Sequence, residues 1–463
     1  HVERYATKAL SYNVNNINAL ETLLIVSRLK NKQNEFSSLA KSILSIDPLN
    51  HMVAFETARI NAYTKEAIDS ALSKIKNEFK EETLLDVAIR YHNLGFDTEA
   101  LMTLMLGSKN PKNKLWIAYL QKDINESERI RILKQVLEAP IDLVFPYRRE
   151  TLPVLEWANA QEDHWKLKYY LAQNYMAVGL PEKGEKLLKV LGEAPDSDIF
   201  YRYRAVAFKN PDYESKYNDI QKALKLNPSD WKVWEENILF LLENAKYDEA
   251  YTLSKKAYQK FKSTYNIELA HAKALLNTGR YKEVLSVLKS IQVLPYEHAS
   301  ESRKIYERAH LGLANALLAK KNYKAARKVL QASKEWPENI GVGKPYSPDE
   351  RMQDYLLAIC EGAMGNNESK DNLLQAIAKY TDEHSQRSDI DHLFGLLALK
   401  QLGDEVELTR QVAQLESDEG SENTTNRLVL ALYKNDSETI AALQSQTKIP
   451  KDIWEGILAA LQL

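Results

Sequence analysis

The chain has 463 residues, more than the roughly 250 to 300 at which one hydrophobic core stops growing, so it forms several domains or one elongated array. Only 15 Gly and 14 Pro interrupt stretches rich in helix-forming residues, which favours helices over a β-rich or α/β enzyme. The 62 Lys and Arg balance 64 Asp and Glu, giving a formal net charge of -2. Because no global field attracts polyanions, we expect no nucleic-acid partner.

The cysteine content and the hydropathy further restrict the class of protein. The single cysteine, Cys360, excludes an intramolecular disulfide framework and a zinc site built on several cysteines. No apolar run approaches the roughly 18 residues that span a bilayer, so no membrane span is expected. The chain begins at His1 without a signal-peptide pattern, which suggests a fragment of a longer protein and leaves its compartment open.

The N-terminal region, residues 1–80, is expected to hold helical repeats or a cap. Residues 17–48 read as a helix pair that ends at Asp47-Pro48, because proline blocks helix continuation. The central region, residues 81–350, shows self-similarity with a period of about 34 residues. Five segments share large residues in a first helix, small residues where two helices meet, and a closing turn or proline.

Their members include Leu84, Ala88, Tyr91, Ala100 and Pro111; Leu171, Ala172, Tyr175, Gly184 and Pro195; Trp234, Ile238, Leu241, Ala250 and Ala257; Ala272, Leu275, Gly279, Val284 and Pro295; and Leu313, Ala314, Leu317, Ala326 and Pro337. Small residues let the two helices of a hairpin approach closely, and large ones fill the space between hairpins. A single hairpin cannot bury its apolar face, so the hairpins must stack.

Two segments of the central region interrupt the period. Residues 112–160 are helical but off-period, and their prolines predict a kink or packed loop near Phe145-Pro146-Tyr147. The Gly- and Pro-rich segment 336–348 is expected to be a structured loop. Its candidate contact residues are Trp336, Lys344 and Tyr346. Either it is a connector packed on neighbouring helices, or it forms a lip of a binding surface or touches another domain.

The C-terminal region, residues 351–463, is expected to hold further helical repeats and a cap, with one pair broken at Gly362 and Gly365. The fold class expected for the whole chain is all-α, a right-handed α-α superhelix of about 10 to 13 antiparallel helix pairs.

The helix pairs resemble tetratricopeptide repeats. Residues 145–172 and 336–346 also resemble the C-terminal repeat region of large bacterial proteins whose N-terminal half is a β-rich domain of unknown function associated with carbohydrate metabolism. This resemblance implies that sugar-directed chemistry lies in a missing N-terminal part. It transfers no catalytic residue to this chain.

The sequence shows no set of residues with the types and spacing of a catalytic or metal-binding motif. The nine histidines lack metal-site spacing, and Gly341-Val342-Gly343-Lys344 lacks the Ser or Thr and the preceding strand of a phosphate loop. Cys360 lies in an apolar stretch and reads as a small buried residue. We therefore assign no catalytic residue, metal ligand or cofactor. Carboxylate pairs such as Glu81-Glu82 keep a glycoside-processing alternative open, although they read most simply as solvated helix faces.

The inner surface of such a superhelix is lined by fixed positions of each first helix. In this chain those positions hold Lys166, Tyr169, Gln173, Lys232, Glu235, Asn266, Lys273, Asn277, Arg308 and Asn315. This mixed polar set predicts either a groove for a polar partner or a solvated wall. Lys273 and Asn277 have the spacing of the family's carboxylate clamp but stand later in their helix, which argues against terminal-carboxylate capture.

The function expected is a non-catalytic scaffold whose partner is a protein, a peptide or the N-terminal domain of the same protein. Self-association through an exposed end of the array is a further expectation. The alternative is a carbohydrate-binding or glycoside-processing helical domain that uses aromatic and carboxylate residues.

Overall fold

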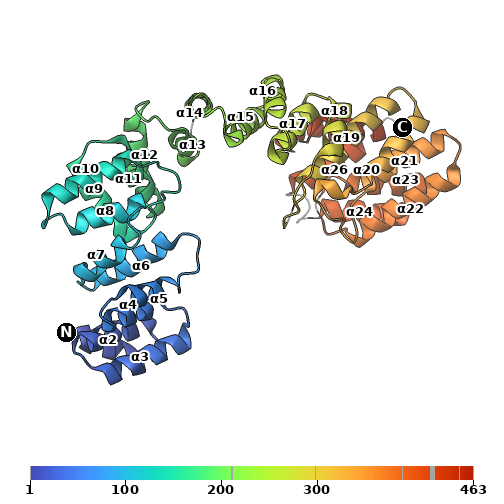
Figure 1. Ribbon diagram of the computed structural model, residues 1–463. Coiled ribbons are helices and arrows are strands. Elements are labelled where there is room, and N and C mark those ends of the chain that lie inside the picture. The colour runs from blue at the N-terminus through green and yellow to red at the C-terminus, as the bar shows by residue number, and fades with distance from the viewer. Residues whose placement is uncertain are drawn as a thin grey trace. The chain divides into compact units, whose positions relative to one another are not determined.

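The computed structural model describes residues 2–209, 212–297, 299–387, 389–417, 423–447 and 449–461 (Figure 1). These residues form helices joined by short loops, and no strand occurs among them. The predicted all-α array of antiparallel helix pairs is confirmed. Within the same ranges we find no helix whose length and hydrophobicity would let it cross a membrane. His1 and His298, two of the histidines weighed above as ligands, lie outside the described residues.

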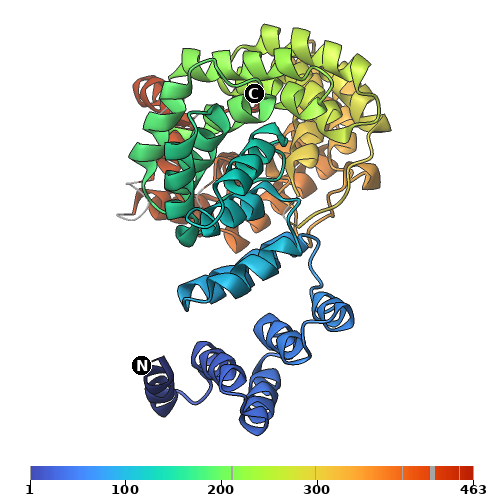
Figure 2. The same cartoon turned by 60° about the vertical axis from the view of Figure 1, so that its left-hand side comes forward.

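The chain divides into two compact units, His1–Asp219 and Ile220–Leu463, with the boundary inside helix α14. The three-region division expected from the sequence stays a prediction. Unit 1 contains α1 (Val2–Tyr12), α2 (Ile17–Leu29), α3 (Gln33–Ile46), α4 (His51–Ile60), α5 (Lys65–Leu72), α6 (Lys80–Asn93), α7 (Asp97–Met105), α8 (Pro111–Leu120), α9 (Glu126–Glu138), η1 (Arg149–Thr151), α10 (Leu152–Gln161), α11 (Trp165–Ala177), α12 (Pro181–Leu191), α13 (Asp198–Ala207) and the start of α14 (Tyr213–Leu226). Figure 2 shows its N-terminal helices, drawn in blue, following one another along the chain.

Unit 2 continues the alternation of first and second helices. It contains α15 (Trp231–Glu243), α16 (Tyr247–Lys260), α17 (Tyr265–Asn277), α18 (Tyr281–Ser290), α19 (Glu301–Leu318), α20 (Tyr323–Ser333), η2 (Glu338–Ile340), α21 (Arg351–Ala363), α22 (Asn367–Glu383), α23 (His392–Leu402), α24 (Glu405–Glu416), α26 (Thr424–Lys434), α27 (Ser437–Thr447) and α28 (Lys451–Leu461). The five repeats read from the sequence correspond to the pairs α6–α7, α11–α12, α15–α16, α17–α18 and α19–α20.

One turn geometry joins the two helices of most pairs. A residue with positive φ ends the first helix, and the next amide donates to the carbonyl five residues earlier, as in Arg280 N to Leu275 O at 2.9 Å. The positive-φ residues of these turns are Asn31, Ala62, Gly95, Gly179, Ala245, Gly279, Lys321, Gly365, Gly403 and Asn435. Glycine was visible in the sequence at half of these turns, whereas Ala62, Ala245 and Lys321 adopt the same geometry without its freedom.

Close helix approach within a pair follows the predicted small residues. Gly184 of α12 faces α11 so tightly that an added Cβ would lie 2.9 Å from the backbone oxygen of Ala172. Ala250 and Ala326 occupy comparable positions in α16 and α20 and are fully buried. Large side chains then fill the layer between pairs, and a continuous core of Leu, Ile, Phe and Tyr residues runs from α19 to α28.

A loop packed between helices lies in the off-period segment. It runs from the end of α9 to η1, and the Asn174 side-chain amide in α11 donates to the carbonyls of Pro146 at 2.7 Å and Arg148 at 2.9 Å. Arg148 in turn binds Glu82 and Asp86 of α6, each at 2.6 Å. Since these bonds tie the loop to helices on both sides, the break in period is a structured connection.

Candidate functional site

The first helices of unit 2 lie next to one another, because α17 packs against α15 and against α19. Seven of the ten candidate groove residues belong to these three helices. They are Lys232 and Glu235 of α15, Asn266, Lys273 and Asn277 of α17, and Arg308 and Asn315 of α19. We call the surface that these residues mark the first-helix face of unit 2.

The part of this face on α15 and α17 is open and polar. Lys232 and Asn277 are exposed. Asn266 donates its side-chain amide to Glu235 Oε1 at 3.2 Å, which links α17 to α15, and Lys273 Nζ lies 2.6 Å from Glu301 Oε1, which links α17 to α19. Partial burial raises the pKa of Glu235. The result is a fixed array of both charge signs, which we call the open end of the face.

The part of the face on α19 is covered by the chain's own last helix, α28, which packs against α19 and α21. Arg308 makes a two-pronged ion pair with Asp452 of α28, with Nε–Oδ2 at 2.9 Å and Nη2–Oδ1 at 2.6 Å. Asn315, two turns further along α19, donates to the backbone oxygen of Asp452 at 2.9 Å. We call this part the covered end. Arg308 and Asn315 were predicted to line an open groove, and both are occupied by α28.

Three candidates belong to unit 1, on α11. Their side chains are buried or partly buried, whereas side chains that line an open groove would be exposed. Tyr169 is 1% exposed, and its ring packs edge-on against Phe200 and Tyr203 of α13 at 5.5 Å between centroids. Gln173, also buried, donates to the Tyr169 hydroxyl at 2.9 Å. Lys166 donates to the carbonyls of Leu137 and Ala139 at the end of α9. These three side chains hold neighbouring helices together, and a binding role for them stays a prediction.

The candidate contact residues of the loop also differ in exposure. Trp336 packs under the Arg303 guanidinium, 4.5 Å from ring centroid to Cζ, whereas Lys344 and Tyr346 are exposed. The loop is tied to residues 291–295 by the bond from Val293 N to Asn339 O at 2.9 Å. Gly341, at φ +68°, allows this approach, because a Cβ there would lie 2.6 Å from Val293 O.

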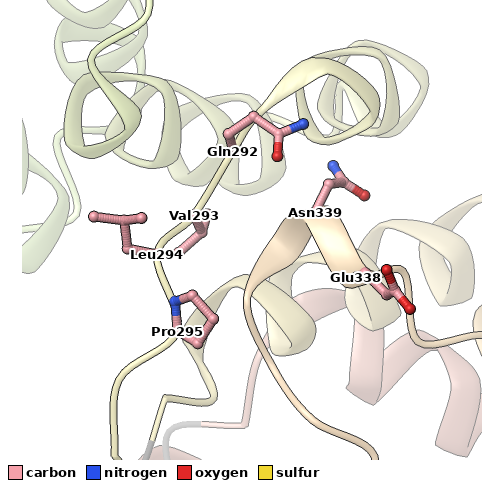
Figure 3. Close-up of a pocket in the computed structure, with 6 residues that line it drawn as sticks. All are labelled: Gln292, Val293, Leu294, Pro295, Glu338 and Asn339. Carbon is pink, nitrogen blue, oxygen red and sulfur yellow. The ribbon is translucent and has the colours of Figure 1, made fainter.

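A depression of about 700 Å³ opens beside this junction (Figure 3). Figure 3 shows residues 292–295 along one side of it, and Glu338 and Asn339 of η2 along the other. The Asn339 side chain is itself engaged, because it donates to the carbonyls of Leu288 and Ile291 at 2.8 and 2.9 Å. The depression is therefore lined by one amide that the scaffold holds in place and by the side chains of Gln292 and Glu338.

One cluster of carboxylates was missed by the sequence reasoning. Asp349, Asp389 and Asp391 bring oxygen atoms within 4.8 Å of one another. The buried Arg351 guanidinium already binds two of them, at 2.6 Å to Asp349 and 2.7 Å to Asp389. Burial, then the neighbouring carboxylates, raise the pKa of Asp391 to about 7. Because Arg351 supplies the counter-charge, the cluster is an internal ion-pair network that joins the start of α21 to the start of α23. Spacing in the sequence could not reveal it, since Asp349 lies 40 residues before Asp389.

Cys360 is buried in α21, and burial raises the pKa of its thiol to about 11. A thiol that stays protonated at neutral pH is a poor nucleophile. The interpretation of Cys360 as a packing residue agrees with this environment.

Comparison with known proteins gives matches among solved structures alone. No protein-family model matches the chain, and no curated protein matches it in sequence. A solved structure of Naa15/Naa10 bound to HypK-THB is 11% identical, with 99% of this chain and 96% of that chain covered and a TM-score of 0.37. Yeast Tom70 is 14% identical over 97% of this chain and 93% of that chain, with a TM-score of 0.30. A tetratricopeptide repeat protein from Parabacteroides merdae ATCC 43184 is 13% identical over 60% and 98%, with a TM-score of 0.28.

Proposed function

We propose that this chain is a non-catalytic scaffold that holds a protein or peptide partner, or a neighbouring domain, on the first-helix face of unit 2. The observation that supports the proposal is the open end of that face. Its exposed Lys232 and Asn277 flank the pairs Glu235–Asn266 and Lys273–Glu301. The helices that carry these residues pack against neighbouring helices on their other sides. Polar groups held on rigid helices can orient a partner with little loss of conformational entropy on binding.

The charge pattern indicates the kind of partner. Lys232 and Lys273 alternate with Glu235 and Glu301 over three neighbouring helices, so neither sign dominates. A polyanion would meet repulsion at the carboxylates, whereas a polypeptide that carries both signs can complement each group. A mixed-charge peptide or protein surface therefore fits the open end.

A photo-crosslinking residue in place of Asn277 tests the proposal, with the same residue in place of Lys256, exposed on the second helix α16, as control. We expect a crosslinked partner from position 277 and none from position 256. When the crosslinking residue stands at position 277, the additional change Lys273→Glu should abolish the crosslink, because it reverses one of the charges at the open end. Equal crosslinking at both positions, or crosslinking that survives the charge reversal, would contradict the proposal.

We also propose that these repeats serve a larger carbohydrate-associated protein, and the resemblance of residues 145–172 and 336–346 supports this second candidate. Each of these segments exposes an aromatic ring, Tyr147 in one and Tyr346 in the other, and exposed rings can stack on sugars. Calorimetry with a panel of oligosaccharides tests direct sugar binding. Heat that disappears in Tyr346→Ala would support it, and a silent titration with the unchanged chain would remove it.

A further inference from the structure

The last helix, α28, departs from the order of the array. In a solenoid each pair contacts the pairs next to it. α28 instead packs on α19 and α21, and its Asp452 binds Arg308, which lies 144 residues earlier in the chain. Ile449 and Pro450 precede it, and proline prevents α27 from running on into α28.

The contact surface under α28 combines apolar burial with polar recognition. Ile457 is fully buried and Ala460 is 2% exposed, and both belong to the core that α19 and α21 share. Asp452 is 2% exposed, so its charge is removed from water and depends on the Arg308 guanidinium. Because that pairing is two-pronged, the site selects a carboxylate at one place along the helix.

The base of the site is shaped for a helix that approaches closely. Gly456 lies one turn after Asp452, and a Cβ added there would meet the Met352 methyl group of α21 at 2.3 Å and the Asn315 amide at 3.5 Å. On the other side, the Tyr281 ring lies against Gly312 of α19. Burial, then the carboxylates of Asp452 and Glu455, raise the pKa of Tyr281 to about 12. Arg308, Asn315 and Met352 therefore contact the first turns of α28.

We propose that the covered end is a helix-binding groove and that α28 is a tethered occupant, which a partner helix of the same pattern replaces. That pattern is an amphipathic helix with an acidic residue in its first turn and a small residue one turn later. The groove is continuous with the open end through α19, so a partner held at the open end could extend its contact by displacing α28. This inference rests on the proposed scaffold function and adds to it the class of partner and a built-in competitor.

Binding of a fluorescent peptide with the sequence of residues 450–461 to the full chain tests the proposal. Asp452→Ala removes the carboxylate that pairs with Arg308, which weakens the docking of α28 and leaves Arg308 free for the peptide. This variant should therefore bind the peptide at least ten-fold more tightly than the unchanged chain. Arg308→Ala combined with Asp452→Ala should lose that gain. Glu249→Ala, which removes an exposed carboxylate from the second helix α16, is the matched control and should leave peptide affinity unchanged.

A peptide affinity that Asp452→Ala does not increase, or that the double variant retains, would overturn the proposal. If Asp452→Ala fails to fold, hydrogen exchange on the unchanged chain decides. Amides of α28 should then exchange through a local opening, before those of α19 and α21, whereas exchange of all three helices in one step would make α28 a fixed part of the core. Crosslinking at position 277 tells the two proposals apart: if it succeeds while the peptide fails to bind, only the groove is removed.

Discussion

The two ends of the first-helix face use the same positions of successive first helices but differ in what lies above them. At the open end, Glu235, Asn266 and Lys273 bind groups on the adjacent first helices and remain partly accessible. At the covered end, Arg308 and Asn315 bind a helix from the far end of the chain. Register within a repeat therefore identifies the face, and the segment that lies on it decides whether a position is available to a partner.

The largest expected difference between the two ends concerns their ion pairs. Asp452→Ala leaves Arg308 half-enclosed without its carboxylate, and we expect the free energy of unfolding of unit 2 to fall by about 3 kcal/mol. Glu301→Ala removes the carboxylate that pairs with Lys273. This pair is partly in water, so the free energy of unfolding of unit 2 should change by less than about 1 kcal/mol. Urea denaturation followed by circular dichroism gives both values. Equal losses would show that α28 does not bury its ion pair.

The next effect concerns the contact of Tyr281 with α19 beside α28. Gly312→Ala places a methyl group where the Tyr281 ring lies, 2.3 Å from Cζ, so the ring must move away from α19. We expect a loss of about 2 kcal/mol from this overpacking, read from the thermal unfolding midpoint. Combining Gly312→Ala with Tyr281→Ala should recover part of the loss. A double variant as unstable as the sum of its single changes would contradict the contact.

A smaller effect contrasts two turns of the open end. Ala245, between α15 and α16, adopts φ 57°, and Gly279, between α17 and α18, adopts φ 72°. Because left-handed backbone is strained for alanine, Ala245→Gly should stabilise the chain and Gly279→Ala should destabilise it, each by about 1 kcal/mol. Chemical denaturation of the two variants measures this. Shifts of the same sign would indicate that the two turns are not equivalent.

The smallest effect concerns the charge of the open end. The folded-state pKa of Glu235 lies above its ordinary value of 4.5, so the unfolded chain releases this proton at lower pH than the folded chain. Stability should therefore fall as pH rises from 4.5 through the folded-state pKa. Glu235→Gln keeps an acceptor for Asn266 and removes the titration. Thermal midpoints between pH 4 and pH 7 should show a flatter profile for this variant, and an identical profile would contradict the assignment.

The sequence was sufficient for the repeat architecture, because its signals are local. Ala172 with Gly184, and Gly279 at a hairpin turn, mark close helix approach and left-handed backbone at fixed spacing. The turn at Lys321 escaped prediction, because lysine carries no preference for positive φ. The partner of Arg308 was also out of reach, since the pattern of α28 predicts an amphipathic helix but not which face it covers. The burial of Tyr169 on α11 could not be read from its register either, because the α13 rings that bury it come from another repeat.

A double-mutant cycle on Arg308 and Asp452 tests most directly whether α28 occupies the first-helix face. The free energies of unfolding of the unchanged chain, Arg308→Ala, Asp452→Ala and the double variant give the coupling between the two residues. We expect a coupling of about 2 kcal/mol or more, because each single change strands the other charge. Effects that add to within about 0.5 kcal/mol would show that the two side chains do not interact, and would contradict the docking of α28 on α19.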